Sequence, residues 1–295
     1  MSFKSRKGFI SNTKTKILIP RSFCCYDVSV VIPVKDNQDG IDRFLREFFL
    51  THKREFYPKE IIIVDNNSHS PIIIRDEFLS DKTPIRLLKC SRKGPACARN
   101  DGYRKTVGEW ILFTDSDCLP TETFLTGCIN AANGAVAYAG NVRALGNDVL
   151  SRYYDEQEIL IPPKYTDENG TESPEYLVTA NCLVWTDALH RIGGFDESFP
   201  VAGGEDIDLG FRLRQIGKLR FALDSVVHHN FEDGILGFLH RFYRYGIGNG
   251  LVARLHSLNL KPRFFLPNNR RFVNYFIACL QFLTLRIGYE TCNVA

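Results

Sequence analysis

Residues 110–117 read WILFTDSD, an apolar run that ends in two aspartates, Asp115 and Asp117. Short apolar runs rich in aromatic and β-branched side chains predict a buried strand. In open α/β sheets, ligands bind beyond the carboxyl ends of the strands. Because the two carboxylates stand at such an end, this stretch predicts both a strand and the place of a site.

Three similar runs precede it in the chain. Residues 28–34 (VSVVIPV), 61–64 and 85–88 are short and apolar, as the strands of a parallel sheet are when both faces are buried. Between them, residues 41–50 carry apolar side chains at helical spacing, and Pro95 is placed to begin a second helix. Strands that alternate with helices predict an α/β fold, in which a mostly parallel sheet is flanked by helices.

Polar clusters follow three of these predicted strands, and all three clusters would lie on the same edge of the sheet. They are Lys35-Asp36-Asn37, Asp65-Asn66-Asn67 and Asp115-Ser116-Asp117. One polar turn after one strand carries no information, but three on one edge indicate a site.

Beyond residue 145 the alternation of strands and helices is weaker. We expect a polar surface loop over 165–176, strand-like sequence over 176–185, a helix over 207–216 and an extended segment over 221–227. The last segment ends at His228 and its neighbour His229.

Composition sets broad limits on the function. The 295 residues are 44% hydrophobic and 24% charged, as in a soluble globular protein, and the net charge of +3 gives no reason to expect a nucleic-acid partner. The nine cysteines are scattered and show no CxxC pair, which favours free thiols in a reducing compartment. We therefore expect a cytoplasmic protein, either soluble or peripheral on the cytoplasmic face of a membrane.

Two acidic pairs are candidates for chemistry. Asp115 and Asp117 repel each other unless a cation or a proton lies between them, and hard oxygen ligands suit Mg²⁺ or Mn²⁺; a polar turn that caps a helix near Thr121 is the alternative. The second pair, Glu205 and Asp206, follows two glycines at a predicted helix start, where carboxylates are also favoured merely as caps.

Two further side chains could serve the same site. Arg99, on the helix after Pro95, suits a diphosphate or the carboxylates that hold its metal, with a helix-surface position as the alternative. His228, at a predicted strand end, could complete a metal site, and a structural role is the alternative. Only one of two successive strand residues can face the site.

Six motifs in order over roughly residues 27–231 resemble family 2 glycosyltransferases of the GT-A fold. They are VSVVIPVKDN, IIIVDNNS, GPACARNDG, WILFTDSDCLP, IGGFDESF and GGEDIDLGFRLRQIG. The resemblance implies a metal-dependent, inverting transfer of a sugar from a nucleotide-diphosphate donor, with a UDP-sugar favoured, to a hydroxyl on a glycan or a lipid-linked glycan. It implies Mn²⁺ or Mg²⁺ as the cofactor.

The resemblance also implies residue roles. The nucleoside would contact Pro33, Val34, Asp36, Asp65 and Asn66. The donor and its metal would contact Asp115 and Asp117, with His228 as a further ligand, and Asp206, beside Glu205, would be the catalytic base. The sequence departs from the usual pattern at Lys35 and Asp36, and at the VDNNS turn over 64–68, where VDDGS is common. These departures leave the base and the sugar open.

Three other classes were weighed. A phosphohydrolase of the haloacid dehalogenase type would also place two aspartates after a strand, but it expects Thr or Val where this chain has Leu119. A nucleotidyltransferase would need a glycine-rich basic loop at 34–40, which is absent. A non-catalytic sugar or nucleotide binding module would not need the acidic residues at 115, 117 and 206.

The sequence divides into a basic arm over 1–26, a catalytic domain over 27–231 and a helical carboxyl-terminal extension over 232–295. No apolar run reaches the ~18–20 residues of a spanning helix; the nearest, 272–285, is interrupted by polar residues. Basic residues precede this run, so the extension either packs on the catalytic domain or contacts a membrane surface.

Overall fold

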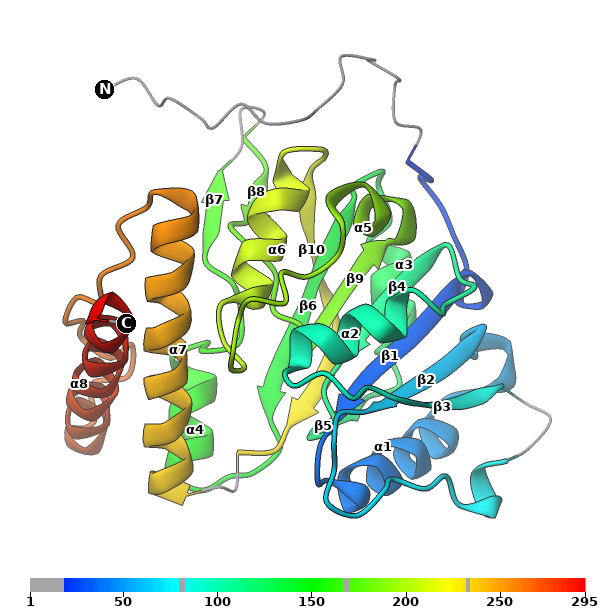
Figure 1. Ribbon diagram of the computed structural model, residues 1–295, viewed down its shortest axis with the longest axis horizontal. Helices are drawn as coiled ribbons and strands as arrows, with labels where there is room; N and C mark the ends of the chain where they lie inside the picture. The colour runs from blue at the N-terminus through cyan, green and yellow to red at the C-terminus, as the bar shows by residue number, and fades with distance from the viewer. Residues whose placement is uncertain (1–18, 80–82, 167–169, 232–233, 295) are drawn as a thin grey trace.

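The computed structural model describes residues 19–79, 83–166, 170–231 and 234–294, and its centre is a mixed sheet of eight strands. The strand order is β3-β2-β1-β4-β9-β6-β10-β5 (Figure 1). β1 pairs in parallel with β2 and β4, and β2 with β3, whereas β9 runs antiparallel to both β4 and β6. The predicted α/β fold with a mostly parallel sheet is confirmed.

The elements have the following bounds. The strands are β1 (Val28–Val34), β2 (Glu60–Asp65), β3 (Ile85–Lys89), β4 (Trp110–Thr114), β5 (Cys118–Pro120), β6 (Ala137–Ala144), β7 (Lys164–Thr166), β8 (Glu172–Pro174), β9 (Asn181–Trp185) and β10 (Leu219–His229). The helices are α1 (Gln38–Thr51), α2 (Pro95–Tyr103), α3 (Thr126–Asn130), α4 (Val149–Glu156), α5 (Thr186–Ile192), α6 (Glu205–Arg214), α7 (Gly234–His256) and α8 (Phe272–Val294). Short 3-10 turns lie at Cys25–Asp27, Arg54–Phe56 and Asp76–Phe78.

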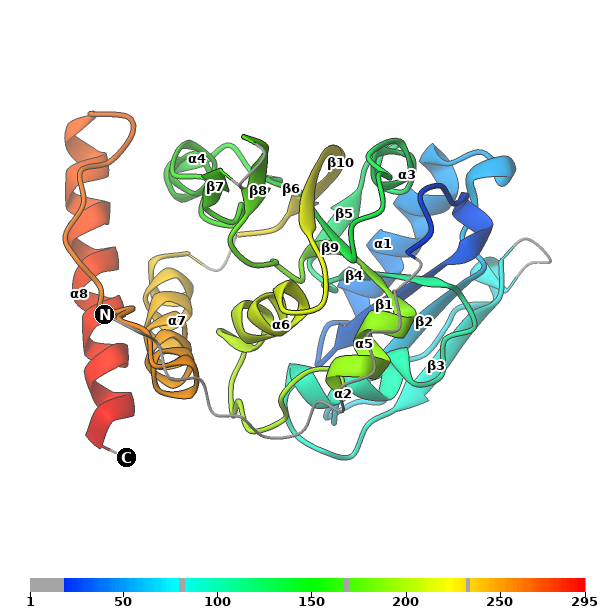
Figure 2. The same cartoon turned by 90° about the horizontal axis from the view of Figure 1, so that it is seen from above.

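Helices cover both faces of the sheet. Seen from above, α2, α5 and α6 lie on one side and α1 and α3 on the other (Figure 2). α1 begins where the Asn37 side chain accepts a hydrogen bond from the Gly40 amide, and it buries Phe44 and Phe48. α7 and α8 stand together at one end of the sheet and contact each other along much of their length (Figures 1 and 2).

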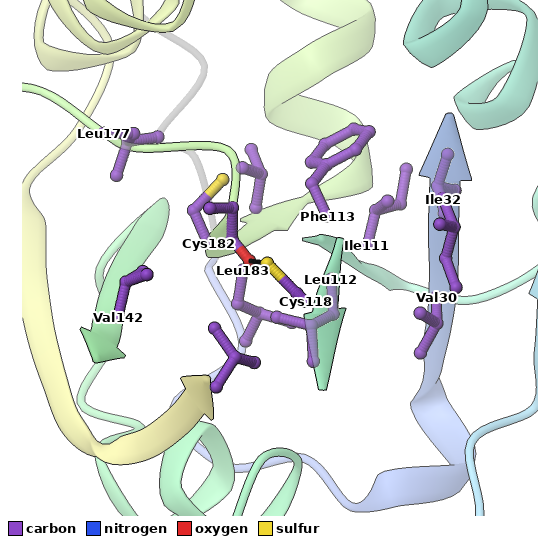
Figure 3. Packing of buried hydrophobic residues seen from close by; sticks show 14 of the residues in the cluster. Val30, Ile32, Ile111, Leu112, Phe113, Cys118, Val142, Leu177, Cys182 and Leu183 are labelled. Atoms are coloured by element: carbon purple, nitrogen blue, oxygen red, sulfur yellow. Dashed lines mark hydrogen bonds between the residues drawn. The ribbon is translucent and has the colours of Figure 1, made fainter. Parts of the chain in front are cut away.

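The core lies around the central strands of the sheet. Every residue of β1 and β4 is buried. Leu112 of β4 pairs with Val30 of β1 and with Leu183 of β9, and the next residue, Phe113, points to the opposite face of the sheet (Figure 3). Strands buried on both faces need apolar side chains at every position, not at every second one. This is why β1, β2 and β4 could be identified as continuous apolar runs; β3 is only half-buried.

Three segments differ from the sequence-based expectation. The loop predicted over 165–176 is partly a hairpin of β7 and β8. Within 176–185, only Asn181–Trp185 forms a strand. The pair after β4 does not cap a helix near Thr121: the backbone turns at Asp115, whose carbonyl accepts from the Cys118 amide, and enters the short strand β5.

The cysteines behave as expected. All nine lie within the described residues and are free thiols, seven of them buried. They contribute to the core as small apolar side chains.

The boundaries at both ends also differ from expectation. Residues 1–18 of the predicted basic arm lie outside the described residues, but Phe23 is buried and stacks on Trp110 with 4.5 Å between ring centroids. The end of the predicted arm therefore packs with the catalytic domain. At the other end, the helix over Phe272–Cys292 is long and apolar enough to cross a membrane by length and composition, so the expectation that no segment would qualify was wrong.

Candidate active site

One large cavity, of about 940 Å³, opens beyond the carboxyl ends of β1, β2 and β4. Its lining combines three groups of residues that are far apart in sequence. The strand-end group is Pro33, Val34, Lys35, Asn66, Asn67, Asp115, Ser116 and Asp117; the α6 group is Gly203, Gly204, Glu205 and Asp206; the helix group is Arg241, Phe242, Arg244, Tyr245, Asn249, Gln281 and Leu285. A cavity thus lies at the predicted edge of the sheet, and α7 and α8 form its far wall.

Arg99 joins the two acidic pairs. Its guanidinium is buried and donates to Asp115 Oδ1 at 2.7 Å and to Glu205 Oε1 at 2.9 Å. These carboxylates raise the pKa of Arg99 above its usual range although burial opposes them, so it stays charged. The expected helix position of Arg99 is correct, and its surface alternative is wrong.

Two glycines shape the turn that presents the second pair. Gly203 and Gly204 have φ values of 136° and 94°, which favour glycine, and a side chain at Gly204 would strike the backbone of Gly248 in α7. This close approach lets the Gly203 amide donate to Glu205 Oε2 at 2.7 Å. Glu205 thus uses one oxygen for the glycine turn and the other for Arg99, and it is buried.

Asp206 has a different environment. It lines the cavity, and its Oδ1 accepts from the Ile207 amide at 2.9 Å. Burial, and then the negative charge of Glu205, raise the pKa of Asp206 to about 7, against the opposing effect of Arg99. A carboxylate with a pKa near neutrality can both accept and release a proton at physiological pH.

Asp117 lies beside a histidine. His229 Nε2 is 3.3 Å from Asp117 Oδ2, while its Nδ1 lies 2.9 Å from the Asn230 carbonyl, which can only accept. Nδ1 must therefore carry a proton, and in the neutral ring Nε2 presents a lone pair toward the carboxylate. Two acceptors at this distance require a proton or a cation between them.

A divalent cation fits this place. Asp117 Oδ1 is buried with no hydrogen-bond partner among the described residues, and the Asp117, Cys118 and His229 ligand atoms lie within 4.8 Å of one another. Burial raises the pKa of Cys118 well above its ordinary value, so that residue stays a neutral thiol. The remaining ligands, a carboxylate and an imidazole, suit Mn²⁺, and the carboxylate also suits Mg²⁺.

The choice of His228 as the metal ligand requires a correction. His228 does not line the main cavity; it lines a smaller hollow with Glu47, Thr51 and Leu119. Because successive strand residues face opposite sides, His229 is the member of the pair that points to the site. Both histidines were visible in the sequence, but the register of β10 was not.

The predicted nucleoside contacts divide into two groups. Pro33, Val34 and Asn66 line the cavity. Asp36 and Asp65 do not: Asp36 holds His69, and Asp65 accepts from the amides of Ser68 and Ile72. These two carboxylates brace the loop after β2, and their contact with the nucleoside stays a prediction.

Most residues of the far wall could not be identified from the sequence. Tyr176, Arg244, Tyr245 and Gln281 line the cavity, and none was a candidate. The only signal was the aromatic and basic composition of 238–247, which does not reveal where a helix docks.

Comparison with known proteins agrees with this geometry. The family described as "Glycosyl transferase family 2" matches residues 29–193. The "Pre-mycofactocin glycosyltransferase" of Mycobacterium tuberculosis is 30% identical over 249 residues, covering 80% of this chain and 49% of that protein. "Glycosyltransferase AglE" of Haloferax volcanii is 27% identical, covering 81% and 78% respectively. The chain thus spans about half the length of the mycobacterial relative.

Solved structures share the fold. A mannosyltransferase from Pyrobaculum calidifontis, in complex with GDP-Man and Mn²⁺, has a TM-score of 0.55 at 16% identity, covering 96% of this chain and 79% of that chain. Residues 1–349 of TarS from S. aureus, in complex with UDP, have a TM-score of 0.51 at 16% identity, covering 90% and 91%. At such identity, the likeness extends to the fold alone.

Proposed function

The chain belongs to glycosyltransferase family 2, and we propose that it transfers a glycosyl group from a nucleotide-diphosphate sugar to an acceptor hydroxyl, with inversion at the anomeric carbon. The observation that carries the proposal is the division of the two acidic pairs by Arg99. One carboxylate of each pair is tied to the arginine, and Asp117 and Asp206 remain for ligands. The alternatives of a phosphohydrolase and a non-catalytic binding module explain less well both the family match and the way in which Arg99 divides the acidic pairs.

The donor occupies the strand-end side of the cavity in this proposal. Pro33, Val34 and Asn66 surround the nucleoside, with a UDP-sugar as the favoured donor, and Lys35 and Lys93 add positive charge there. Asp117 and His229 would hold Mn²⁺ or Mg²⁺, which neutralises charge on the departing diphosphate. Asp115 orients the turn through Arg99 and faces the donor.

The acceptor approaches from the side of α7. Asp206 takes the proton of the acceptor hydroxyl as its oxygen forms the new bond to the anomeric carbon. The bond from that carbon to the diphosphate breaks, and the nucleoside diphosphate leaves with the electron pair. Because nucleophile and leaving group lie on opposite sides, the configuration inverts.

We also propose the extent of the catalytic unit, its location in the cell and the class of acceptor. The catalytic unit extends from Phe23 through α6 and β10, and α7 and α8 complete it as the acceptor wall. A cytoplasmic location agrees with nine free thiols. The acceptor is a glycan or a lipid-linked glycan.

A donor screen tests the function. Purified full chain is incubated with UDP-, GDP- and dTDP-sugars plus Mn²⁺, and released nucleotide is measured with and without excess chelator. We expect slow release from at least one donor, its loss on chelation and its recovery when Mn²⁺ or Mg²⁺ is restored. If nucleotide release continued unchanged in excess chelator, the metal assignment would be contradicted. If no donor released nucleotide, the proposed glycosyl transfer would be contradicted.

A further inference from the structure

The outer face of α8 is more apolar than that expected of a helix on a soluble protein. Its inner face buries Ile277 and Ala278 in the core together with two polar residues, Asn274 and Gln281, which bond to Glu156 and to the Tyr153 hydroxyl respectively. Its outer face exposes large apolar side chains: Phe272 is 91% exposed, Phe276 62% and Ile287 60%. A helix whose outer face lies in water normally exposes polar side chains on that face.

We call the exposed apolar side chains of α8 and of the loop before it the outer patch. At 100° per residue, the exposed helix positions fall in one sector, opposite the buried ones. The preceding loop runs alongside α8 and adds two more exposed apolar side chains (Figure 2). The outer patch consists of Phe264, Leu266, Phe272, Val273, Phe276, Leu283 and Ile287.

Basic residues lie close in sequence to the outer patch. Residues 257–295 contain five basic residues and one acidic residue, a net charge of +4, whereas the whole chain carries +3. Arg263, Arg270 and Arg271 are exposed, and none of them forms an ion pair within the described part of the chain. An apolar stripe with a basic rim complements an anionic lipid surface.

Other occupants fit less well. A second copy related by two-fold symmetry would bring two patches of the same positive charge together. A membrane-spanning position would strip Asn274 and Gln281 of their partners, and it would separate Gly288 from α7, where a side chain would strike the Tyr243 carbonyl. The inner face of α8 is thus committed to the protein, and only the outer face is available.

We infer that the outer patch lies flat on an anionic lipid surface and that the acceptor reaches the site from that surface. Gln281 and Leu285 of the same helix line the cavity, so α8 separates lipid from the acceptor side by one helix diameter. The inference rests on the proposed function only in naming the acceptor class: a hydroxylated glycan on a lipid anchor.

Vesicle co-sedimentation of the full chain tests the surface. Vesicles of phosphatidylcholine are compared with vesicles that also contain phosphatidylglycerol, at low and high salt. We expect at least about tenfold stronger binding to the anionic vesicles at low salt, and a weaker but persistent binding at high salt, because salt screens charge and not hydrocarbon burial. A chain that stays in the supernatant with both vesicles at low salt overturns the inference.

Matched variants separate the outer patch from charge in general. The triple variant Arg263→Glu, Arg270→Glu, Arg271→Glu should lose the anionic preference. The triple variant Arg43→Glu, Lys53→Glu, Arg54→Glu, which changes exposed residues at the opposite end of the molecule by the same charge, should keep it. Equal losses in both triples would overturn the inference.

A fluorescence experiment tests the depth and the competing occupant. Phe272→Trp should be quenched by brominated acyl chains, whereas the buried Trp110 and Trp185 should not. Sedimentation of the same variant should show a monomer; a dimer abolished by Phe272→Ser, without vesicle binding, would overturn the inference in favour of a second copy. None of these measurements needs turnover, so they remain interpretable if the donor screen fails.

Discussion

Two acidic pairs contribute to one cavity, and Arg99 divides both in the same way. Asp115 in the first pair and Glu205 in the second each accept a hydrogen bond from its guanidinium, at 2.7 and 2.9 Å. All four carboxylates line the cavity, and within the described residues neither Asp117 nor Asp206 accepts a hydrogen bond from Arg99. One buried arginine thus gives each pair a member that holds the structure and a member that is available to a ligand.

The available members differ in what surrounds them. Asp117 has an oxygen without a partner and an imidazole at 3.3 Å, an arrangement suited to a cation. Asp206 lies at the start of α6, and burial beside Glu205 raises its pKa to about 7, an arrangement suited to a proton. The environment, and not the residue type, assigns the chemistry.

Removing the proton acceptor should have the largest effect. Asp206→Asn keeps the size of the side chain and removes its basicity, so kcat should fall by about 10²- to 10⁴-fold while the donor dissociation constant changes little. The exposed Asp224→Asn serves as the control. Near-normal turnover at saturating substrate would place the base on another carboxylate.

Removing the shared arginine should disrupt both pairs together. Arg99→Met leaves Asp115 and Glu205 without their cation, and breaking a buried ion pair costs about 3–5 kcal/mol of unfolding free energy. Arg92→Met removes an arginine that pairs with Asp101 and Glu197 near the surface, where about 1 kcal/mol or less is expected. Urea denaturation measures both, and equal losses would show that Arg99 is not the special link.

The raised pKa of Asp206 predicts a stability cost. The folded state holds the Asp206 proton up to about pH 7, whereas the unfolded carboxyl releases it near its ordinary pKa of 3.8. The unfolding free energy therefore falls as pH rises between these values and stays low above them. Asp206→Asn removes this cost and should stabilise the protein by about 1–3 kcal/mol at pH 8, with little change at pH 4. An equal effect at both pH values would contradict the assigned shift.

The smallest expected effect, and the most specific test, comes from the two adjacent histidines. His229→Gln should raise the Mn²⁺ concentration for half-maximal activity by about tenfold or more, because it removes a lone pair beside Asp117. His228→Gln, which faces the smaller hollow, should leave it unchanged. The opposite result would restore His228 as the ligand.

Most strands in the first half of the chain could be predicted from the sequence, and fewer in the second half. Strands β1, β2 and β4 are buried on both faces, so their apolar runs identify them without further context, whereas β3 is only half-buried. β6 reads AYAGNVRA, in which small and polar residues hide a strand that is positioned by its neighbours. The hairpin of β7 and β8 is also polar, so its strands could not be identified from the sequence either.

The site shows the same limit. The acidic residues were found because a strand end and a glycine pair mark them locally. The choice between His228 and His229 depends on the register of β10, and the roles of Asp36 and Asp65 depend on a loop that folds back on them. The α7 wall depends on packing between distant segments, for which a single sequence carries no local signal.

The contact of Gly204 with Gly248 has one more consequence. At this point the turn that carries Asp206 meets α7 backbone to backbone, with no side chain between them to change rotamer. The distance between Asp206 and the helix wall is therefore fixed by main-chain geometry. Under the proposed function, this fixed spacing limits which acceptors can bring a hydroxyl to the Asp206 carboxylate.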